Sequence, residues 1–196
     1  NEDLVIYGEP GSYTETFAAD HDITFKTTDK FPQVADGFAA DGKNWVYYRN
    51  GKEEESLTTV IYGEVKGEKG WWYVEKGVVK FKKVGLVQYD GNWWYIESGQ
   101  VKFNKTGLVY DEMYGWWYVE GGKVKFNKTG LVYDSVYGWG YVEYGNVKFN
   151  KTGIVEDSEY GSWYVKSGNV DFGYNGTYWY NGLLYNVNNG HAVKTR

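Results

Sequence analysis

One short unit recurs along this chain, and its period constrains the fold more than any other feature. The unit GWWYVEGGKVKFNKTG occupies residues 115–130, and related units begin at Gly70, Asn92, Gly138 and Gly161, at steps of 22, 23, 23 and 23 residues. Repetition at a short fixed period is typical of stacked architectures, in which a single unit cannot bury its apolar face and needs a neighbour. We therefore expect an array of similar units rather than a globular sandwich.

Each unit has the pattern of a β-hairpin. A glycine at position 77, 99, 122, 145 or 168 separates two runs in which aromatic and β-branched residues alternate with other residues. This glycine and the residue before it fit a two-residue turn whose backbone needs positive φ angles. The composition agrees, because 20% of the residues are aromatic and only 2 are prolines.

Pairing across the turn sorts the side chains onto two faces. With Lys76 and Gly77 at the turn, Trp72 lies opposite Phe81, and we assign the face that carries them to the core. The expected core residues are Trp72, Val74, Val79 and Phe81, then Trp94, Ile96, Val101 and Phe103, then Trp117, Val119, Val124 and Phe126, with Trp163 in the fifth unit. Gly140 interrupts this core series, and Ser162 interrupts the opposite face, so the fourth and fifth units should be the least regular.

The opposite face combines large rings with charges. Its first members are Trp71, Tyr73, Glu75 and Lys80. We expect the glutamates and lysines to form cross-strand charge pairs that keep the array soluble, with hydrogen bonding to ligand hydroxyls as a secondary role. The rings on this face are the candidate ligand-binding residues: Trp71, Tyr73, Trp93, Tyr95, Trp116, Tyr118, Trp139, Tyr141 and Tyr164.

These features predict an all-β fold, a repeat β-solenoid of stacked two-stranded hairpins with an irregular N-terminal cap. The cap is residues 1–43, with short strands at 4–7 and 23–25 and a helical turn within 31–42. The solenoid is residues 44–196, with regular units over about 70–176 and a C-terminal cap at 177–196. A recurring glycine at 85, 107, 130 and 153 is expected to mark a sharp corner in each connector.

Several classes of function are disfavoured. The net charge of −5 favours neither nucleic acid nor an acidic membrane as partner, and no apolar stretch is long enough for membrane insertion. There is no cysteine, the recurring connector aspartates lack the spacing of a calcium loop, and no motif for a cofactor is present, so we expect no metal and no cofactor. Only His21 and His191 are histidines, and every prominent acid belongs to a ladder rather than to a unique cluster. We therefore expect a protein that is not an enzyme.

The segment GWWYVEGGKVKFNKTGLV at residues 115–132 resembles the choline-binding and glucan-binding cell-wall repeats of Gram-positive surface proteins. The resemblance extends over roughly residues 44–190. It implies a hairpin solenoid outside the cell, in which aromatic rings between successive hairpins bind choline or polysaccharide. The choline-type unit has tryptophan after threonine-glycine, whereas this chain has Leu108, Leu131 or Ile154 there. A cage that lacks one ring loses about 0.5–2 kcal/mol of cation–π attraction, and this departure favours a polysaccharide.

The sequence thus predicts a non-catalytic, secreted or cell-surface module of a Gram-positive bacterium that attaches its parent protein to a glucan or cell-wall glycan. Flat sugar faces would stack on the exposed tryptophans and tyrosines, and regular spacing would add avidity. Two alternatives stay open: a choline-type cell-wall anchor, and a structural or adhesin module that binds a host protein.

Overall fold

The computed structural model describes residues 4–8, 10–27 and 36–195. A small N-terminal unit contains β1 (Val5–Gly8), α1 (Tyr13–Asp20) and β2 (Thr24–Thr27), and the two strands pair in parallel. Both strands overlap the expected ones at 4–7 and 23–25, whereas α1 was not predicted. No helix among the described residues is long and apolar enough to span a membrane.

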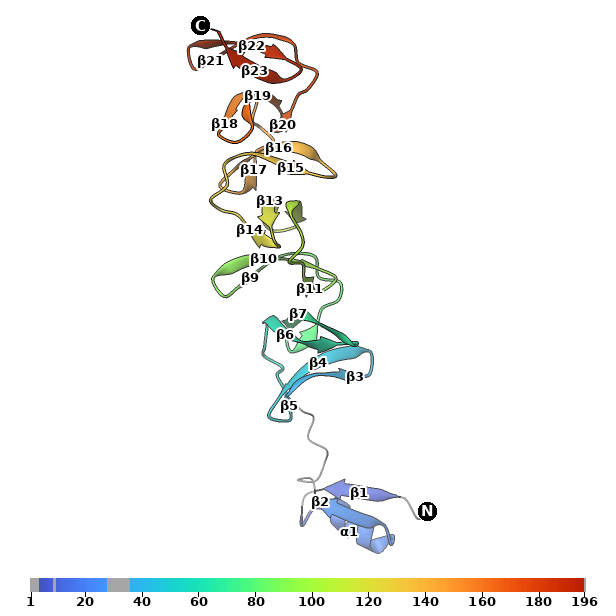
Figure 1. Cartoon of the computed structure of the whole chain (residues 1–196). Helices are drawn as coiled ribbons and strands as arrows, with labels where there is room; N and C mark the ends of the chain where they lie inside the picture. Colours follow the sequence, from blue (N-terminus) through green and yellow to red (C-terminus); the bar gives the residue numbers. More distant parts are fainter. Residues whose placement is uncertain (1–3, 9, 28–35, 196) are drawn as a thin grey trace.

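From Gly37 onward the chain is a stack of antiparallel hairpins that follow one another along a single axis (Figure 1). The prediction of an all-β hairpin solenoid is confirmed. In each unit a hairpin of two longer strands continues into a third, shorter strand. The units are β3 (Gly37–Asp41), β4 (Asn44–Arg49) and β5 (Lys52–Glu53); β6 (Thr59–Val65), β7 (Glu68–Glu75) and β8 (Val78–Val79); β9 (Gly85–Tyr89), β10 (Asn92–Glu97) and β11 (Gln100–Val101); β12 (Gly107–Asp111), β13 (Gly115–Glu120) and β14 (Lys123–Val124); β15 (Gly130–Asp134), β16 (Gly138–Glu143) and β17 (Asn146–Val147); β18 (Gly153–Asp157), β19 (Gly161–Lys166) and β20 (Asn169–Val170); and β21 (Gly176–Tyr180), β22 (Leu183–Asn188) and β23 (His191–Lys194).

The first hairpin begins inside the segment expected to be the cap. Strand β3 pairs with β4 along its whole length, from Gly37 opposite Tyr48 to Asp41 opposite Asn44, so residue 44 lies just after a turn. The expected helical turn within 31–42 is wrong for 37–41, which form β3, while residues 31–35 lie outside the described residues. Phe38 is the one large apolar side chain of this strand, and it packs against the core cluster that contains Trp72.

The predicted two-residue turns are present. Lys76 and Gly77 have φ angles of 53° and 74°, and both φ angles are likewise positive in the pairs that begin at Ser98, Gly121, Tyr144 and Ser167. Such turns match the twist of the flanking strands. A threonine from the preceding connector supports several of them, because the Thr129 Oγ1 atom accepts a 3.0 Å hydrogen bond from the Tyr144 N–H.

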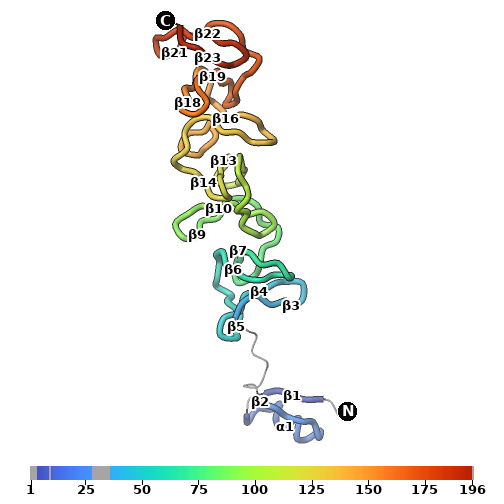
Figure 2. The backbone as a smooth tube through the Cα atoms, in the orientation of Figure 1, coloured from blue at the N-terminus to red at the C-terminus, as the bar shows by residue number. Residues whose placement is uncertain are grey.

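Each hairpin is hydrogen-bonded to the next at one fixed place. Trp72 in β7 pairs with Gln100 in β11, Trp94 in β10 with Lys123 in β14, and Trp117 in β13 with Asn146 in β17; the Tyr73 N–H donates to the Gly99 carbonyl at 2.8 Å. The turn of one hairpin is thereby held against the strand of its predecessor, and the tube in Figure 2 shows these loops following one another up the stack.

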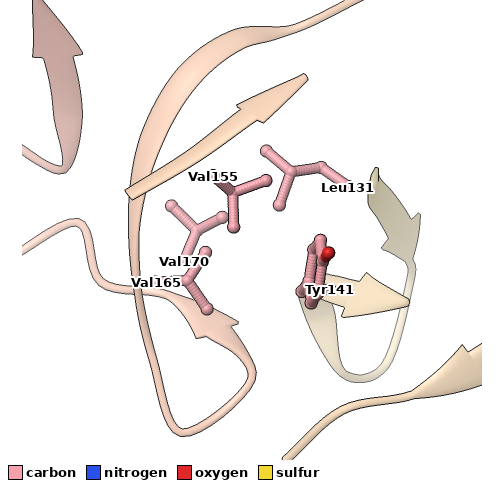
Figure 3. Packing of buried hydrophobic residues seen from close by; sticks show 5 residues of the cluster. All are labelled: Leu131, Tyr141, Val155, Val165 and Val170. Carbon is pink, nitrogen blue, oxygen red and sulfur yellow. The ribbon is translucent and has the colours of Figure 1, made fainter. Parts of the chain in front are cut away.

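The core is divided into small clusters between neighbouring hairpins. In the five units from β6–β8 to β18–β20, the residue two places after the second aromatic position is fully buried: Val74, Ile96, Val119, Val142 and Val165. Figure 3 shows one cluster, in which Tyr141 and Leu131 of one unit face Val155, Val165 and Val170 of the next. Because each cluster needs two hairpins, one unit alone has no complete core.

The phenylalanines assigned to the core are placed differently. Phe103 and Phe126 are 49% and 48% exposed, and Trp94, Trp117 and Trp163 are only half-buried. The prediction failed because the returning strand has only two paired residues, such as Gln100–Val101, so the phenylalanine lies beyond the paired region. These rings form the rim of a cavity instead.

Candidate ligand-binding cages

The most complete cavity lies between the fifth and sixth hairpins and is named here the Trp139 cage. Its aromatic walls are Trp139 from β16, Tyr160 from the β18–β19 turn, Trp163 from β19 and Phe172 after β20. Leu131 and Val170 also line it, and its volume is about 130 Å³. The Trp139 and Tyr160 ring centroids are 4.6 Å apart, and those of Trp163 and Phe172 are 5.6 Å apart, both in edge-to-face arrangement.

The same construction recurs two units earlier in the Trp93 cage. Trp93, Tyr114, Trp117 and Phe126 surround a cavity of about 120 Å³, with Leu86 as an aliphatic wall. Trp93 lies 4.7 Å from Tyr114, and Trp117 lies 5.4 Å from Phe126, as measured between ring centroids. The Trp117 indole N–H also donates a 2.8 Å hydrogen bond to the Tyr114 carbonyl, which fixes two walls relative to one another.

A third cavity, the Trp71 cage, is built with a different tyrosine. Trp71, Trp94 and Phe103 occupy the positions that Trp93, Trp117 and Phe126 have in the Trp93 cage. The fourth ring is Tyr89, the last residue of β9. Asp90 also lines this cavity, which measures about 220 Å³. The two-residue Asp90–Gly91 turn contains no tyrosine, whereas the longer turns supply Tyr114 and Tyr160 to the other two cages.

The corresponding place between the fourth and fifth hairpins lacks one wall and is named the Trp116 site. Trp116 and Tyr137 keep the cage geometry, with ring centroids 4.9 Å apart. Gly140 stands where the other units have the second tryptophan, and Phe149 lies 6.1 Å from Trp116 instead of packing on such a ring.

At the first interface of the stack, a cation of the protein itself lies at the rings. Tyr47 donates to Gly77 as Tyr73 donates to Gly99, so Trp45 is the counterpart of Trp71. Trp45 packs against the cluster that contains Trp72 and Phe81. The Lys66 ammonium lies 3.9 Å from the centroid of the Phe81 ring. This place is named the Trp45 site.

Buried aspartates hold the cages together. The Asp157 Oδ1 atom accepts from the N–H groups of Glu159 and Tyr160 at 2.9 and 3.0 Å, and its Oδ2 atom accepts from Leu131 at 2.8 Å. One carboxylate therefore fixes the tyrosine wall against the leucine wall of the previous hairpin. Asp111 and Asp134 make the same set of bonds in the Trp93 cage and the Trp116 site.

The hydrogen bonds keep two of these carboxylates ionised. Burial alone would raise the pKa of Asp134, but the backbone N–H groups of Val136, Leu108 and Tyr137 and the charge of Lys105 outweigh it and lower the pKa. The pKa of Asp157 is lowered in the same way, with Leu131, Tyr160 and Glu159 as donors and Lys128 as the nearby charge. The recurring connector acids are thus structural clamps, and no group of acids and histidines in the described chain is arranged to hold a metal.

The expected ring ladder is divided between two environments. Trp71, Trp93, Trp116 and Trp139 are half-buried, and each forms a wall of one cage or site. The tyrosines pack into the clusters between hairpins: Tyr73, Tyr95 and Tyr118 are half-buried, and Tyr141 and Tyr164 are only 8% and 7% exposed. The expectation of an exposed ladder is therefore wrong for Tyr141 and Tyr164, because both faces of a stacked hairpin meet a neighbour.

Of the four aromatic walls of each cage, only the leading tryptophan was assigned to ligand binding from the sequence. Tyr114, Tyr137 and Tyr160 were passed over as connector residues, although each directly precedes the glycine that opens a hairpin. That recurrence was a usable signal. The leucine after threonine-glycine does not leave a gap, because Leu131 is itself a wall of the Trp139 cage and Phe172 supplies another ring.

The cages are suited to an organic cation with methyl groups. Their faces are aromatic or aliphatic, and a cation held within about 6 Å of several ring centroids gains cation–π attraction. Aromatic cages of this kind are the usual protein sites for quaternary ammonium groups.

Comparison with known proteins agrees with this geometry. A family model described as a choline-binding repeat matches residues 35–53, 63–80, 82–102, 104–125 and 150–171, together just over half of the chain. The unmatched interval 126–149 contains Gly140. No curated protein sequence is significantly similar to the chain.

Several solved structures are similar to the chain. CbpJ from Streptococcus pneumoniae shares 23% identity over 81% of this chain and 52% of its own, with a TM-score of 0.38. CbpF in complex with ipratropium shares 21% identity over 82% and 54%, with a TM-score of 0.38. The modular autolysin LytC from S. pneumoniae shares 19% identity over 80% and 38%, with a TM-score of 0.37. This chain therefore spans about half the length of the first two proteins and 38% of the third. On the strength of the repeat match across its length, the chain belongs to the choline-binding repeat family.

Proposed function

We propose that this chain is a non-catalytic module that binds choline-type quaternary ammonium groups in the Trp71, Trp93 and Trp139 cages. Through them it attaches its parent protein to choline-bearing polymers of a Gram-positive cell wall. Choline on cell-wall teichoic acids is the ligand of choline-binding repeats, and proteins of the family lie on the surface of Gram-positive cells. The choline-type alternative therefore replaces glucan as the preferred ligand.

The observation that carries the proposal is the position of Lys66. Its ammonium lies 3.9 Å from the Phe81 ring centroid, and Phe81 packs edge-to-face on Trp72 as Phe172 packs on Trp163. The protein thus places a cation of its own against one such pair of rings. Among the cation–ring contacts of the described chain, none places a lysine over Phe103, Phe126 or Phe172. The Lys123 Nζ atom lies 5.9 Å from the Trp94 ring of the Trp71 cage, which is farther than Lys66 lies from Phe81.

The expected affinity of one cage is modest. Three or four rings at about 0.5–2 kcal/mol each correspond to a Kd of roughly millimolar. Several cages on one stack can bind one polymer together, which raises overall retention by about 10²-fold or more when the spacing of the choline groups fits. A solenoid of weak cages is therefore sufficient for attachment to a wall.

The test is a paired titration with choline and its uncharged isostere 3,3-dimethylbutan-1-ol, followed by NMR of the tryptophan indole N–H groups. Choline should shift the Trp71, Trp93 and Trp139 signals with Kd values of about 1 mM, and the isostere should bind at least about 10-fold more weakly, since it lacks the cation–π term. Equal affinity for both compounds, or shifts confined to tryptophans outside the cages, would contradict the proposal.

A second titration addresses Lys66. In the Lys66→Ala variant, choline should also perturb the Trp45 and Trp72 signals, since the competing ammonium is gone. Lys69→Ala removes a charge from the same hairpin and is the matched control. If choline shifts the Trp45 and Trp72 indole signals equally in the two variants, the Lys66 ammonium does not occupy a choline-binding site.

A further inference from the structure

A polar groove adjoins the Trp139 cage and shares two of its walls. The groove measures about 360 Å³, within the range of roughly 300–1,000 Å³ typical of small-molecule sites. It is lined by Tyr118, Glu120, Lys125, Asn127, Lys128, Leu131, Val132, Tyr133, Glu159 and Tyr160, of which Leu131 and Tyr160 also line the cage. A ligand held in the cage is therefore next to the groove.

Tyr160 separates the two cavities. Its ring packs on Trp139 on the cage side, with centroids 4.6 Å apart, while Lys128 Nζ lies 5.9 Å from the same ring centroid. Glu159 and Tyr160 both line the groove, and a hydrogen bond with Glu159 is the main reason why the pKa of Tyr160 is raised. One side chain thus offers an aromatic surface to the cage and a polar end to the groove.

The charges in the groove balance. The Lys125 Nζ atom lies 2.9 Å from Glu120 Oε2, and the Lys128 Nζ atom lies 3.9 Å from Glu159 Oε2. A phosphate in the groove would face two carboxylates as well as two ammonium groups. A neutral polyhydroxylated ligand has no such conflict, since hydroxyls can donate to the glutamates and accept from the lysines and Asn127.

Aromatic surface is present beside these polar groups. Tyr118 is half-buried, and burial followed by the charges of Glu120 and Glu159 raises its pKa. The carboxylate of Glu159 therefore acts on a ring two hairpins earlier. Tyrosine faces combined with hydroxyl-binding side chains are the usual elements of a sugar site.

Glu159 distinguishes this groove from its counterparts. Met113, Val136 and Glu159 occupy equivalent places, because each donates its backbone N–H to Oδ1 of its clamp aspartate at 2.8–2.9 Å. Only the third has a side chain that can bind a hydroxyl. The chain therefore offers apolar versions of the same position for comparison.

We infer that the groove lined by Tyr118, Asn127 and Glu159 is a subsite for a neutral pyranose sugar attached to the ammonium-bearing group held in the Trp139 cage. This inference rests on the proposed function for the cage. It adds that the protein also recognises the sugar to which the ammonium-bearing group is attached. It makes the Trp139 cage selective among choline-bearing glycans, whereas the Trp93 cage, with Met113 at the equivalent place, accepts the ammonium group alone.

The test uses choline and the 2-(trimethylammonio)ethyl glycosides of glucose, galactose, N-acetylglucosamine and N-acetylgalactosamine. Binding is measured separately at each cage from the indole signals of Trp139 and Trp93 in the full chain. At least one glycoside should bind about 10-fold more tightly than choline at Trp139, as expected of one or two added hydrogen bonds, and no more tightly than choline at Trp93.

Glu159→Val, which reproduces the residue at position 136, and Asn127→Ala should each bring the Trp139 affinity for that glycoside back to the value for choline. Asn104→Ala, the equivalent change beside Val136, is the control and should preserve the gain. The Kd for choline is measured in each variant, and the gain is expressed as the ratio of the choline Kd to the glycoside Kd in that same variant, so any effect of Glu159 on the Tyr160 wall cancels.

The outcomes separate the two proposals. Choline binding without any difference between glycosides at Trp139 and Trp93, or a gain that survives both groove variants, would overturn the sugar subsite and leave the cages intact. Absence of choline binding at every cage would overturn the proposed function; if the glycosides then still bound at Trp139 and lost affinity in Glu159→Val, the groove alone would be confirmed, and if they did not bind, both proposals would fail.

Discussion

The Trp139 cage and the Trp116 site are adjacent copies of one construction that differ at one wall. Both have a leading tryptophan with a tyrosine 4.6 or 4.9 Å away, and both are tied by a buried aspartate, Asp157 or Asp134. At the remaining wall the first has Trp163 and the second has Gly140. The same fold is thus present with and without this ring.

The hairpins do not need the missing ring. The Tyr141 N–H donates to Gly168 at 2.8 Å, as the Tyr164 N–H donates to Gly190 at 2.8 Å, so the link between neighbouring hairpins is unchanged beside Gly140. Val142 is as fully buried as Val165. The comparison teaches that the stack forms without a second tryptophan at this place, whereas Trp163 supplies a cavity wall and also packs against the core cluster of its interface.

The largest expected effect comes from converting the complete cage into the incomplete one. In Trp163→Gly, choline affinity at the Trp139 cage should fall by about 100-fold, which corresponds to about 2.7 kcal/mol from the lost cation–π attraction and apolar contact. The measurement is the choline titration followed at the Trp139 indole signal. The Trp93 signal in the same sample is the control and should titrate unchanged.

Loss of Trp163 also removes a hydrogen bond, since its indole N–H donates to the Tyr160 carbonyl at 2.7 Å. Trp163→Leu is the matched variant, because it lacks the same donor but retains an apolar side chain. A choline Kd in Trp163→Gly that equals the wild-type value would show that the ring is not a ligand wall and would remove the basis of the comparison.

The reciprocal change should create a binding site. Gly140 has no positive φ angle, and a Cβ atom there would lie 3.5 Å from Leu108 Cδ1, which is ordinary contact. Gly140→Trp should therefore fold and raise choline affinity at the Trp116 indole by about 10-fold, the effect of one added ring of up to 2 kcal/mol after some loss to side-chain ordering.

Gly140→Leu is the control for this gain, since it fills the same space without an aromatic face. Calorimetric titration of the Gly140→Trp variant should give one more choline site per chain than the wild type. If Gly140→Leu and Gly140→Trp bind choline equally at Trp116, filled volume rather than ring chemistry governs the site.

The sequence was informative about the turn and the central aliphatic residues of each hairpin. The Lys76–Gly77 turn and the burial of Val74 and Val79 follow from alternation and turn chemistry, which act over a few residues. The leading tryptophans Trp93 and Trp139 were assigned to the outer face; both line cavities, and both also pack against core clusters.

Contacts between hairpins could not be predicted in the same way. Asp157 binds the Leu131 N–H across 26 residues, and alternation within a hairpin carries no information about such a link. A free outer face was assumed, but stacking covers it, which is why Tyr141 and Tyr164 are buried. For the same reason Tyr160, in a turn, becomes a wall of a cavity formed by its neighbours.

The smallest expected effect is a loss of stability in acid that both places share. The pKa values of Asp134 and Asp157 are lowered in the folded protein, below the ordinary value of 3.8, by backbone hydrogen bonds that outweigh burial. A group whose folded pKa is depressed stabilises the protein above its ordinary pKa, and this stabilisation is lost as the pH falls through the folded pKa. Thermal unfolding should therefore shift to lower temperature between pH 5 and pH 3, about 2–4 °C per kcal/mol for a chain of this size.

The double variant Asp134→Asn, Asp157→Asn should be less stable than the wild type at pH 7 and should have a flatter dependence on pH below 5, because two of the titrating clamps are gone. Glu112→Gln, at an exposed acid in the β12–β13 turn, is the control and should retain the wild-type slope. Choline binding at the Trp139 and Trp116 indoles should weaken together in the double variant, since each tyrosine wall depends on its aspartate. If the unfolding temperature depends on pH in the same way in the double variant and the control, other carboxylates cause the loss of stability in acid. Asp134 and Asp157 would then stabilise the fold through their hydrogen bonds and not through their ionisation.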